Sequence, residues 1–434
     1  MSPRRLSQLR LGDRMSLKNQ SADSLTLASN SNDTTGPGDV SNDGSVVAAG
    51  ETSSRLLADI RRMAPMIAAR AAEIEAARRV PLDLVETLRS IGVFRMLAPK
   101  SHGGLELELW AALKILAALA KIDGSFGWAA MIGSGTSLFA SLLPRETYDQ
   151  IYRDGPDVIF AGSTQPTGAA EAVEGGLRVN GRWPFASGCQ HADWILAACV
   201  MTKDGQPLPG PIDGVPMTQF VFLPATYWQI EDTWHSAGLK GTGSHHVVLR
   251  DTLVPVANFA DPSSGISCLP GPLYNAPLRI IPLIHAPVAL GIAEGALDDL
   301  AEMAGTGRRQ FRAARAMRDS EVLQYELGCA QANFRAARSY LEIQAASHWS
   351  HARAGTLRDE ALMTEGIQAA VWITNACLRV AEMCFALGGG SAVYEDSMLQ
   401  RRLRDLHVAA QHARVQQRHY IDAGKLFISK ASGG

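Results

Sequence analysis

Apolar residues change their spacing twice along this chain of 434 residues, and that change constrains its fold more than any other feature. After residue 54 they recur every three or four positions, as in Leu57 and Ile60, which predicts amphipathic helices. Between about residues 158 and 261 they fall in short β-rich segments separated by Gly, Pro and Asp-Gly turns. Helical spacing then returns up to about residue 429. This order predicts an α+β multidomain protein.

The same pattern sets the predicted boundaries. We divide the chain into a disordered N-terminal extension (1–53), an all-helical domain (54–157), a central β-barrel or β-sandwich domain (158–262), a connector (263–283) and a C-terminal helical bundle (284–429). Disorder is predicted because 26 of the first 50 residues are Ser, Thr, Asn, Asp or Gly. In the first domain, one helix is expected between Pro81 and Gly92. In the bundle, long helices are expected over about 284–305, 318–354, 358–387 and 397–425.

Charge and composition disfavour several classes of partner. The chain has 41 Lys and Arg against 43 Asp and Glu, so its net charge of −2 provides no general attraction to nucleic acid or anionic lipid. No run of 18 apolar residues appears, and we expect no membrane-spanning segment. The six cysteines form no Cys-x-x-Cys pair and are interpreted as buried, reduced thiols. Together with the lack of an apolar signal segment, they predict a cytoplasmic protein.

Nucleotide-binding motifs and metal sites are not predicted. A Gly-x-Gly-x-x-Gly turn between a strand and a helix is missing, as is a phosphate loop that ends in Gly-Lys-Ser/Thr. His245-His246 would point to opposite faces of a strand. His348 and His351 lack a third ligand and are interpreted as surface residues. His407 and His412 would lie about 140° apart around one helix, so only one of them would face a given cavity.

An aromatic block, Gly181–Trp194, lies inside the predicted β domain. It contains two tryptophans, a phenylalanine and a small Ser187-Gly188 corner. Such a block can be simple core packing. It can also be a platform for a flat aromatic cofactor, whose heteroatoms would bond a Ser hydroxyl or a backbone N–H. The residues of the block alone leave both interpretations open.

Five motifs extend this observation along the chain. They are Asp123-Gly124-Ser125-x-Gly127-Trp128; Gly162-Ser163-Thr164-Gln165-Pro166; the Trp183-to-Trp194 block; Trp234-x-x-x-Gly238-Leu239-Lys240-Gly241-Thr242-Gly243-Ser244; and Gln400-Arg401-x-x-Arg404-Asp405-x-His407-x4-His412. In this order and spacing the chain resembles the acyl-CoA dehydrogenase fold. Within that fold it resembles the group D two-component flavin-dependent monooxygenases, such as the oxygenase components for 4-hydroxyphenylacetate, secosteroid phenols, dibenzothiophene and indole-acetate. The resemblance covers about residues 54–428.

The resemblance implies a set of site residues. His412 matches a histidine near the reactive edge of the flavin, where it would hydrogen-bond the C4a-hydroperoxyflavin or take a proton from the substrate. Ser187 matches the position whose hydroxyl or amide lies near flavin N5. Both are the implied catalytic residues. The implied cofactor-binding residues are Trp128, Gly162, Ser163, Thr164, Phe185, Ala186, Ser187, Arg308, Gly390, Ser391, His412 and Ala413.

The parent dehydrogenases use a glutamate base, which many members carry eight residues after the Arg-Asp pair. Here that position is Ala413, and no carboxylate lies between Asp405 and Asp422. The oxygenase branch therefore resembles the chain better. Because some dehydrogenases carry the base on another helix, an acyl-CoA dehydrogenase-type flavoprotein stays an alternative, as does an N- or S-oxygenating member of the fold.

One departure from the oxygenase pattern concerns the substrate. Several members carry a histidine about eight residues after the tryptophan that Trp128 matches, whereas this chain has Met131–Ser137 there. A second polar anchor for a phenolate is thus missing or replaced by Thr136. An indole or another heteroaromatic stays open beside a phenol.

The implied function is that of an oxygenase component. It would take reduced flavin (FMNH2 or FADH2) from a separate NAD(P)H-dependent flavin reductase and react it with O2 to a C4a-hydroperoxyflavin. One oxygen atom would then be transferred to a small aromatic substrate. The fold usually assembles as a homotetramer in which one subunit's C-terminal bundle completes the flavin site of another.

Overall fold

The computed structural model describes residues 43–432, and from Gly44 onward these form one compact unit. The first helix, α1, covers Asp43–Ala69. It therefore begins before the predicted boundary at residue 53, and residues 43–53 belong to a helix and not to the predicted extension. The rest of that extension, residues 1–42, lies outside the described residues.

Six further helices follow α1 before the sheet. They are α2 (Ala71–Ala77), α3 (Leu82–Ile91), α4 (Leu109–Ile122), α5 (Gly124–Gly135), α6 (Ser137–Ala140) and α7 (Arg145–Ile151). Helix α3 confirms the expectation between Pro81 and Gly92. Pro81 caps its start, and Gly92 adopts φ 91° and donates its N–H to Leu88 O and Arg89 O. Glycine suits this left-handed end because it has no Cβ.

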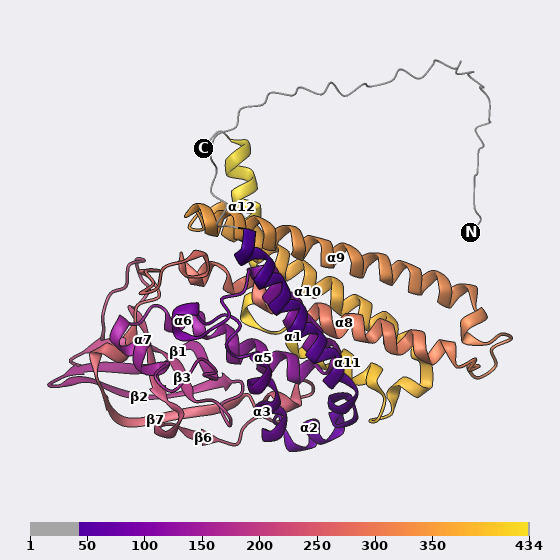
Figure 1. Ribbon diagram of the computed structural model, residues 1–434, viewed down its shortest axis with the longest axis horizontal. Helices are drawn as coiled ribbons and strands as arrows, with labels where there is room; N and C mark the ends of the chain where they lie inside the picture. The colour runs from indigo at the N-terminus through magenta and orange to yellow at the C-terminus, as the bar shows by residue number, and fades with distance from the viewer. Residues whose placement is uncertain (1–42, 433–434) are drawn as a thin grey trace, which may run out of the picture. The chain divides into compact units, whose positions relative to one another are not determined.

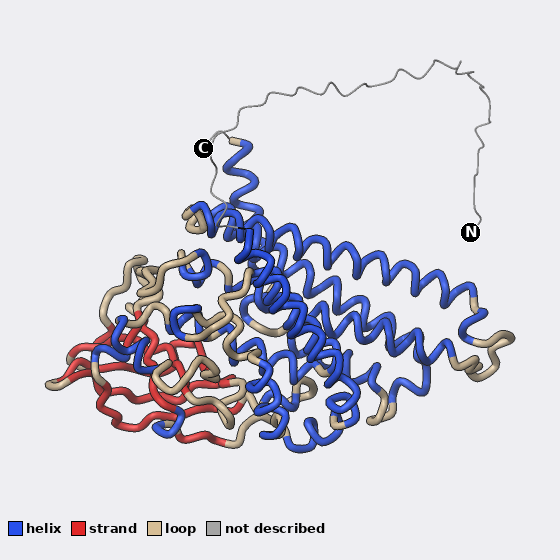
Figure 2. Tube along the Cα trace, viewed as in Figure 1, coloured by secondary structure: helices blue, strands red, loops and turns tan. Residues whose placement is uncertain are grey.

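The central domain is a single eight-stranded sheet (Figure 2). Its strands are β1 (Phe160–Val173), β2 (Gly176–Ala186), β3 (Trp194–Lys203), β4 (Gln206–Pro207), β5 (Thr218–Pro224), β6 (Gln229–Glu231), β7 (His245–Val254) and β8 (Phe259–Ala260). Their order is β6-β7-β2-β1-β3-β5-β8, with β4 beside β3. Among the described strands, β6 and β8 lie at the two ends of this order, so strand pairing does not close the sheet into a barrel. The sequence had left a barrel and a sandwich as alternatives.

Strands β3 and β5 are buried on both faces. Leu196 and Phe222 belong to the main core between sheet and helices, whereas the alternate residues Ile195 and Val221 belong to a second core on the other face. The second core also holds Trp183 of β2, which is fully buried and donates its indole N–H to Ala198 O at 2.6 Å. Burial on both faces explains why these strands have continuous apolar sequences.

The C-terminal part contains α8 (Ile281–Gly305), α9 (Glu321–Ala354), α10 (Glu360–Gly388), α11 (Met398–Ala409) and α12 (Tyr420–Ala431). Helices α8, α9 and α10 run side by side (Figure 1). The predicted bundle is confirmed in its first three helices. The fourth predicted helix, 397–425, is wrong, because the chain leaves the α-helix after Ala409 and resumes it at Tyr420.

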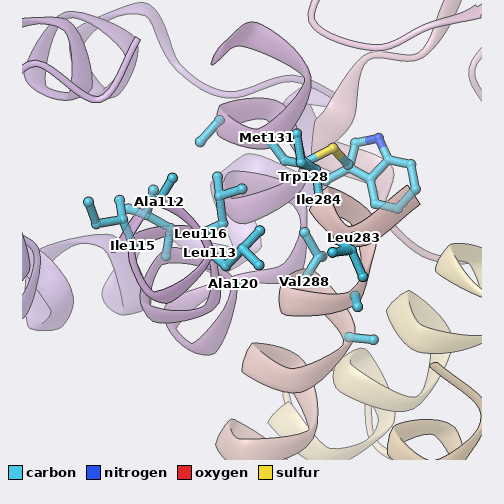
Figure 3. Close-up of a cluster of buried hydrophobic side chains, with 14 of the residues drawn as sticks. Ala112, Leu113, Ile115, Leu116, Ala120, Trp128, Met131, Leu283, Ile284 and Val288 are labelled. Atoms are coloured by element: carbon cyan, nitrogen blue, oxygen red, sulfur yellow. The ribbon is translucent and has the colours of Figure 1, made fainter. Parts of the chain in front are cut away.

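Helix α8 packs against both α4 and α5 (Figure 3). Leu283, Ile284 and Val288 of α8 face the apolar side chains of α4, and Trp128 of α5 lies at one edge of the cluster. The helices approach closely at Gly291, where a Cβ would lie 2.2 Å from Ala117 O. The core helix α8 is thereby fixed beside the face of α5 that carries Trp128.

Two helical stretches are long and apolar enough to cross a membrane by composition, Pro277–Gly305 and Glu360–Val393. The apolar window of the first is 94% buried inside the fold, which is typical of a core helix. The expectation that the chain crosses no membrane stays a prediction.

Candidate active site

The break after α11 positions His412. Ala410 ends the helix, and His412 adopts an extended conformation with φ −63° and ψ 135°. Its Nδ1 accepts the backbone N–H of Arg414 at 3.3 Å and so caps the short turn Ala413–Val415. His407 remains on α11, half exposed, with Nε2 3.6 Å from Glu382 Oε1. The end of α11 therefore lies between the two histidines. The sequence had predicted instead that both lie on one helix, about 140° apart around its axis.

The ring of His412 contacts two other aromatic rings, which come from different parts of the chain. Its ring stacks on that of His285 from α8, with centroids 4.3 Å apart and planes at 25°. Trp128 of α5 contacts both rings edge-on, at 5.5 Å from His412 and 5.9 Å from His285. Trp128 is 7% and His285 8% exposed. The three rings, called the wall below, are largely shielded from solvent.

The two stacked imidazoles have opposite hydrogen-bonding capacity. His285 Nδ1 lies 3.2 Å from Ile281 O, an acceptor only, so this nitrogen carries the proton and Nε2 is an acceptor. His412 Nδ1 accepts from Arg414 N–H, so its neutral ring carries the proton on Nε2, which donates. The pair therefore offers one acceptor and one donor side by side.

Both imidazoles are held neutral. Burial, followed by the charge of Arg414, lowers the pKa of His412 to about 4. Burial, His412 and Arg414 hold the pKa of His285 well below its usual range. No described carboxylate bonds or pairs with either ring. A dehydrogenase base is therefore not found among the described residues that contact this wall.

Ser187 lies on the other side of Trp128 and connects the wall to the sheet. Trp128 Nε1–H donates to Ser187 Oγ at 3.1 Å. The backbone N–H of Ser187 is already donated to Phe185 O at 2.9 Å. The sequence implied that either the hydroxyl or the backbone amide of Ser187 contacts the flavin. Because the amide is already bonded, only the hydroxyl oxygen is available to a ligand.

The end of β2 presents an exposed ring. Phe185 is 55% exposed and adopts φ 64°, which is an outlier for a bulky residue and is typical of functional sites. The next residue, Ala186, is buried. On the neighbouring strand β1, Ser163 is buried and Thr164 exposed, at the start of a register shift between Ser163 and Gly168. Gly162 is partly buried on the same strand, which packs against α5.

The remaining predicted site residues lie elsewhere in the chain. Arg308 is exposed in the loop after α8. Gln310 Nε2 from this loop donates to Leu387 O, which brings the loop beside the turn that holds Gly390 and Ser391. Along α8, His285 and the helix end at Gly305 are about 30 Å apart. One chain therefore does not bring Arg308, Gly390 and Ser391 to the Trp128 wall. Ala413 is exposed beside His412.

Other histidines and the cysteines play no visible part in this site. No group of three His, Cys, Asp or Glu side chains that could hold a metal occurs between residues 43 and 432. His348 is buried and not on the surface as predicted, because its Nδ1 bonds Gln344 O and Gly366 leaves room for the ring. All six cysteines are free, but Cys329 is exposed, contrary to the prediction of buried thiols.

Sequence reasoning missed His285 and Arg414. His285 supplies the second polar group of the wall, in place of Thr136, which is buried at the end of α5. One signal could have found His285: it is the only charged or strongly polar side chain in the apolar run Ile280–Ala293. Arg414 shows no signal in its neighbours, because its partial burial depends on tertiary packing.

The comparisons with known proteins agree with this geometry. Residues 51–145 match the acyl-CoA dehydrogenase N-terminal domain, and residues 283–417 match the acyl-CoA dehydrogenase C-terminal domain. The chain is 32% identical to indole-3-acetate monooxygenase of Pseudomonas putida over 387 residues, 89% of this chain and 95% of that protein. It is also 32% identical to the oxygenase component of the FADH2-dependent resorcinol hydroxylase of a Rhizobium species, over 82% of this chain and 90% of that one.

A solved structure extends the match. XiaF from a Streptomyces species, solved with FADH2 and glycerol, is 26% identical with a TM-score of 0.81 and covers 88% of this chain and 97% of its own. The fold and the site thus define a flavin-dependent oxygenase of the acyl-CoA dehydrogenase fold. The chain belongs to the acyl-CoA dehydrogenase family, and within it to the oxygenase components of the two-component flavin-dependent monooxygenases. It uses reduced flavin, O2 and an aromatic substrate, and depends on a separate flavin reductase.

The described residues fit a flavin. A flat apolar ring needs an exposed apolar surface and a hydrogen-bonding group for its central heteroatoms. Phe185 provides such a surface, because its ring is exposed at the end of β2, where the backbone adopts φ 64°. Ser187 provides a buried hydroxyl oxygen beside Trp128.

Proposed function

We propose that this monooxygenase hydroxylates a small aromatic compound that carries an acidic group, such as an indole or a phenol with a carboxylate side chain. The observation that carries this proposal is the unpaired guanidinium of Arg414 beside the wall. The similarity to an indole-3-acetate monooxygenase supports it.

Arg414 is a half-buried cation without a partner among the described residues. Burial lowers its pKa, and its charge lowers the pKa of both His285 and His412, so the guanidinium lies near the two rings. No residue between 43 and 432 accepts a hydrogen bond from it or forms an ion pair with it. A charge that is partly removed from water and has no partner is costly, and a guanidinium binds a carboxylate through two parallel hydrogen bonds. An anionic group of the substrate would satisfy it.

The side chains of the wall then have distinct tasks. The flavin, when bound in its reduced state, supplies the electrons that activate O2. Trp128 excludes water and packs against the substrate ring. His285 Nε2 accepts a hydrogen bond from a ring N–H or O–H, and His412 Nε2–H donates one to an oxygen atom in the site. Arg414 orients the substrate by its acidic group.

The test compares indole-3-acetate with indole, which has the same ring without the carboxylate. Reduced flavin is supplied by a separate reductase, and products one oxygen atom heavier are measured by mass spectrometry. Arg414→Gln is expected to raise KM for indole-3-acetate about 10- to 100-fold and to change that for indole little, because it removes a charge-assisted bond. Arg418→Gln, an exposed arginine on the next turn, is the matched control.

Each other outcome contradicts part of this proposal. An equal loss for both compounds means that Arg414 does not bind the carboxylate. Weaker binding of reduced flavin in Arg414→Gln, with KM unchanged, assigns the guanidinium to the flavin. No oxygenated product from either compound, although flavin binds, excludes indoles as the proposed substrate.

We further propose that the protein is a cytoplasmic homotetramer. Helices α9 and α12 carry exposed apolar side chains, with Ile343 64%, Phe427 77% and Ile428 67% exposed, and such surfaces are typical of subunit contacts. Assembly would also give a task to Arg308, Gly390 and Ser391, which lie far from their own chain's wall. Light scattering after size-exclusion chromatography should give four copies of the 46.5 kDa chain, and a monomer would contradict this proposal.

A further inference from the structure

Three buried hydroxyl groups form a line behind Trp128. Ser187 Oγ lies 2.6 Å from Ser244 Oγ, and Ser244 Oγ lies 2.7 Å from Thr242 Oγ1. Ser187 and Ser244 are 5% and Thr242 is 1% exposed. Water therefore does not compete for these bonds, and each hydroxyl has a single proton to donate.

The far end of the line has a fixed direction. Thr242 Oγ1 lies 2.8 Å from Leu239 O, which is a carbonyl oxygen and accepts only. Two oxygen atoms at this distance need a proton between them, and only Thr242 has one to give. The proton of Thr242 is therefore directed at Leu239 O, away from Ser244.

The direction then passes along the line. Since Thr242 has used its proton, Ser244 is the donor in the bond to Thr242. Ser187 is in turn the donor in the bond to Ser244. At the near end Trp128 Nε1–H, which can only donate, fills one lone pair of Ser187 Oγ. Ser187 is left with one lone pair and no proton for a ligand.

We propose that Thr242 and Ser244 are positioning residues that hold the proton of Ser187 away from the flavin, so that the site favours reduced over oxidised flavin. This inference rests on the proposed function, with Ser187 at flavin N5 as the family resemblance implies. In reduced flavin N5 carries a hydrogen, which it would donate to the lone pair of Ser187. In oxidised flavin N5 carries a lone pair, which would face that of Ser187 without a proton between them.

The test measures dissociation constants of oxidised and of reduced FMN and FAD, the latter under anaerobic conditions. In Ser244→Ala and in Thr242→Val the proton of Ser187 is released and can be donated to oxidised N5. The ratio of the oxidised to the reduced dissociation constant is therefore expected to fall about tenfold, the value of one net hydrogen bond. Thr242→Ser keeps the hydroxyl and is expected to keep the wild-type ratio.

The outcomes separate this inference from the proposed function. An unchanged ratio in Ser244→Ala and Thr242→Val overturns the inference, as does a Thr242→Ser variant that changes the ratio as much as valine. If Ser244→Ala does not fold, as judged by circular dichroism, the valine and serine variants of Thr242 decide alone. If the wild-type protein binds neither flavin in either redox state, the proposed function itself has failed.

Discussion

His412→Ala is expected to lower the rate of hydroxylation about 10²- to 10³-fold, the usual cost of removing one aligned donor from an active site. The neutral ring of His412 presents Nε2–H beside the acceptor nitrogen of His285. Its alanine variant leaves an oxygen atom in the site without this donor. The measurement is the rate of product formation with reduced flavin supplied in excess.

A glutamine at this position keeps an N–H donor on a side chain of similar reach. His412→Gln is therefore expected to retain more activity than His412→Ala. His407→Ala is the matched control, since His407 lies five residues earlier and is half exposed beside Glu382. It should change the rate less than twofold, on the order of effects seen at exposed positions. An equal loss in His407→Ala and His412→Ala would contradict the assignment.

The second large effect is expected at a buried carboxylate between the domains. Asp405 of α11 accepts the backbone N–H of Leu239 at 2.6 Å, and this bond ties the bundle to the loop before β7. Burial, followed by the charge of Asp123, raises the pKa of Asp405 to about 7. Glu75 acts in the same direction, whereas Arg404 and the bond from Leu239 oppose it.

The sign of the resulting pH dependence follows from the two pKa values of this group. In the unfolded chain an aspartate has a pKa near 3.9. Between about pH 4 and 7 the folded state therefore holds the proton more tightly, and the stability from Asp405 is lost as the pH rises through about 7. Asp405→Asn keeps the acceptor for Leu239 and removes the charge. It is expected to stabilise the fold at pH 8.5 by on the order of 1–3 kcal/mol.

The measurement is the Tm of variant and wild type between pH 5 and 8.5 at one scan rate. The gain should amount to a few degrees at pH 8.5 and shrink toward pH 5. Asp299→Asn is the control, in which the Tm is expected to change in the opposite direction. Asp299 pairs with the buried Arg402, so its loss leaves a charge unpaired and should lower the Tm. A gain in Asp405→Asn that does not depend on pH would contradict the raised pKa.

Elements whose signals lie in neighbouring residues were predictable. Pro81 and Gly92 bound α3, and the apolar runs of β3 and β5 indicated buried strands. The motif that contains Thr242 and Ser244 could be recognised, but the direction of its protons could not, because it depends on the carbonyl of Leu239 and on the indole of Trp128. The break after Ala409 was missed because the helical spacing of apolar residues continues through it.

The sequence by itself determined the order of helices, strands and helices and the family, because periodicity, caps and motif spacing are local properties. Its resemblance to the family also predicted His412 and Ser187 as site residues. Only the tertiary structure decided that His285 stacks on His412 and that Arg414 is half-buried without a partner among the described residues. These contacts arise where α8 passes α5 and the turn after α11, at positions far apart in the chain. Which side chains meet there depends on how closely the helices pack, and Gly291 sets that approach for α8 and α4.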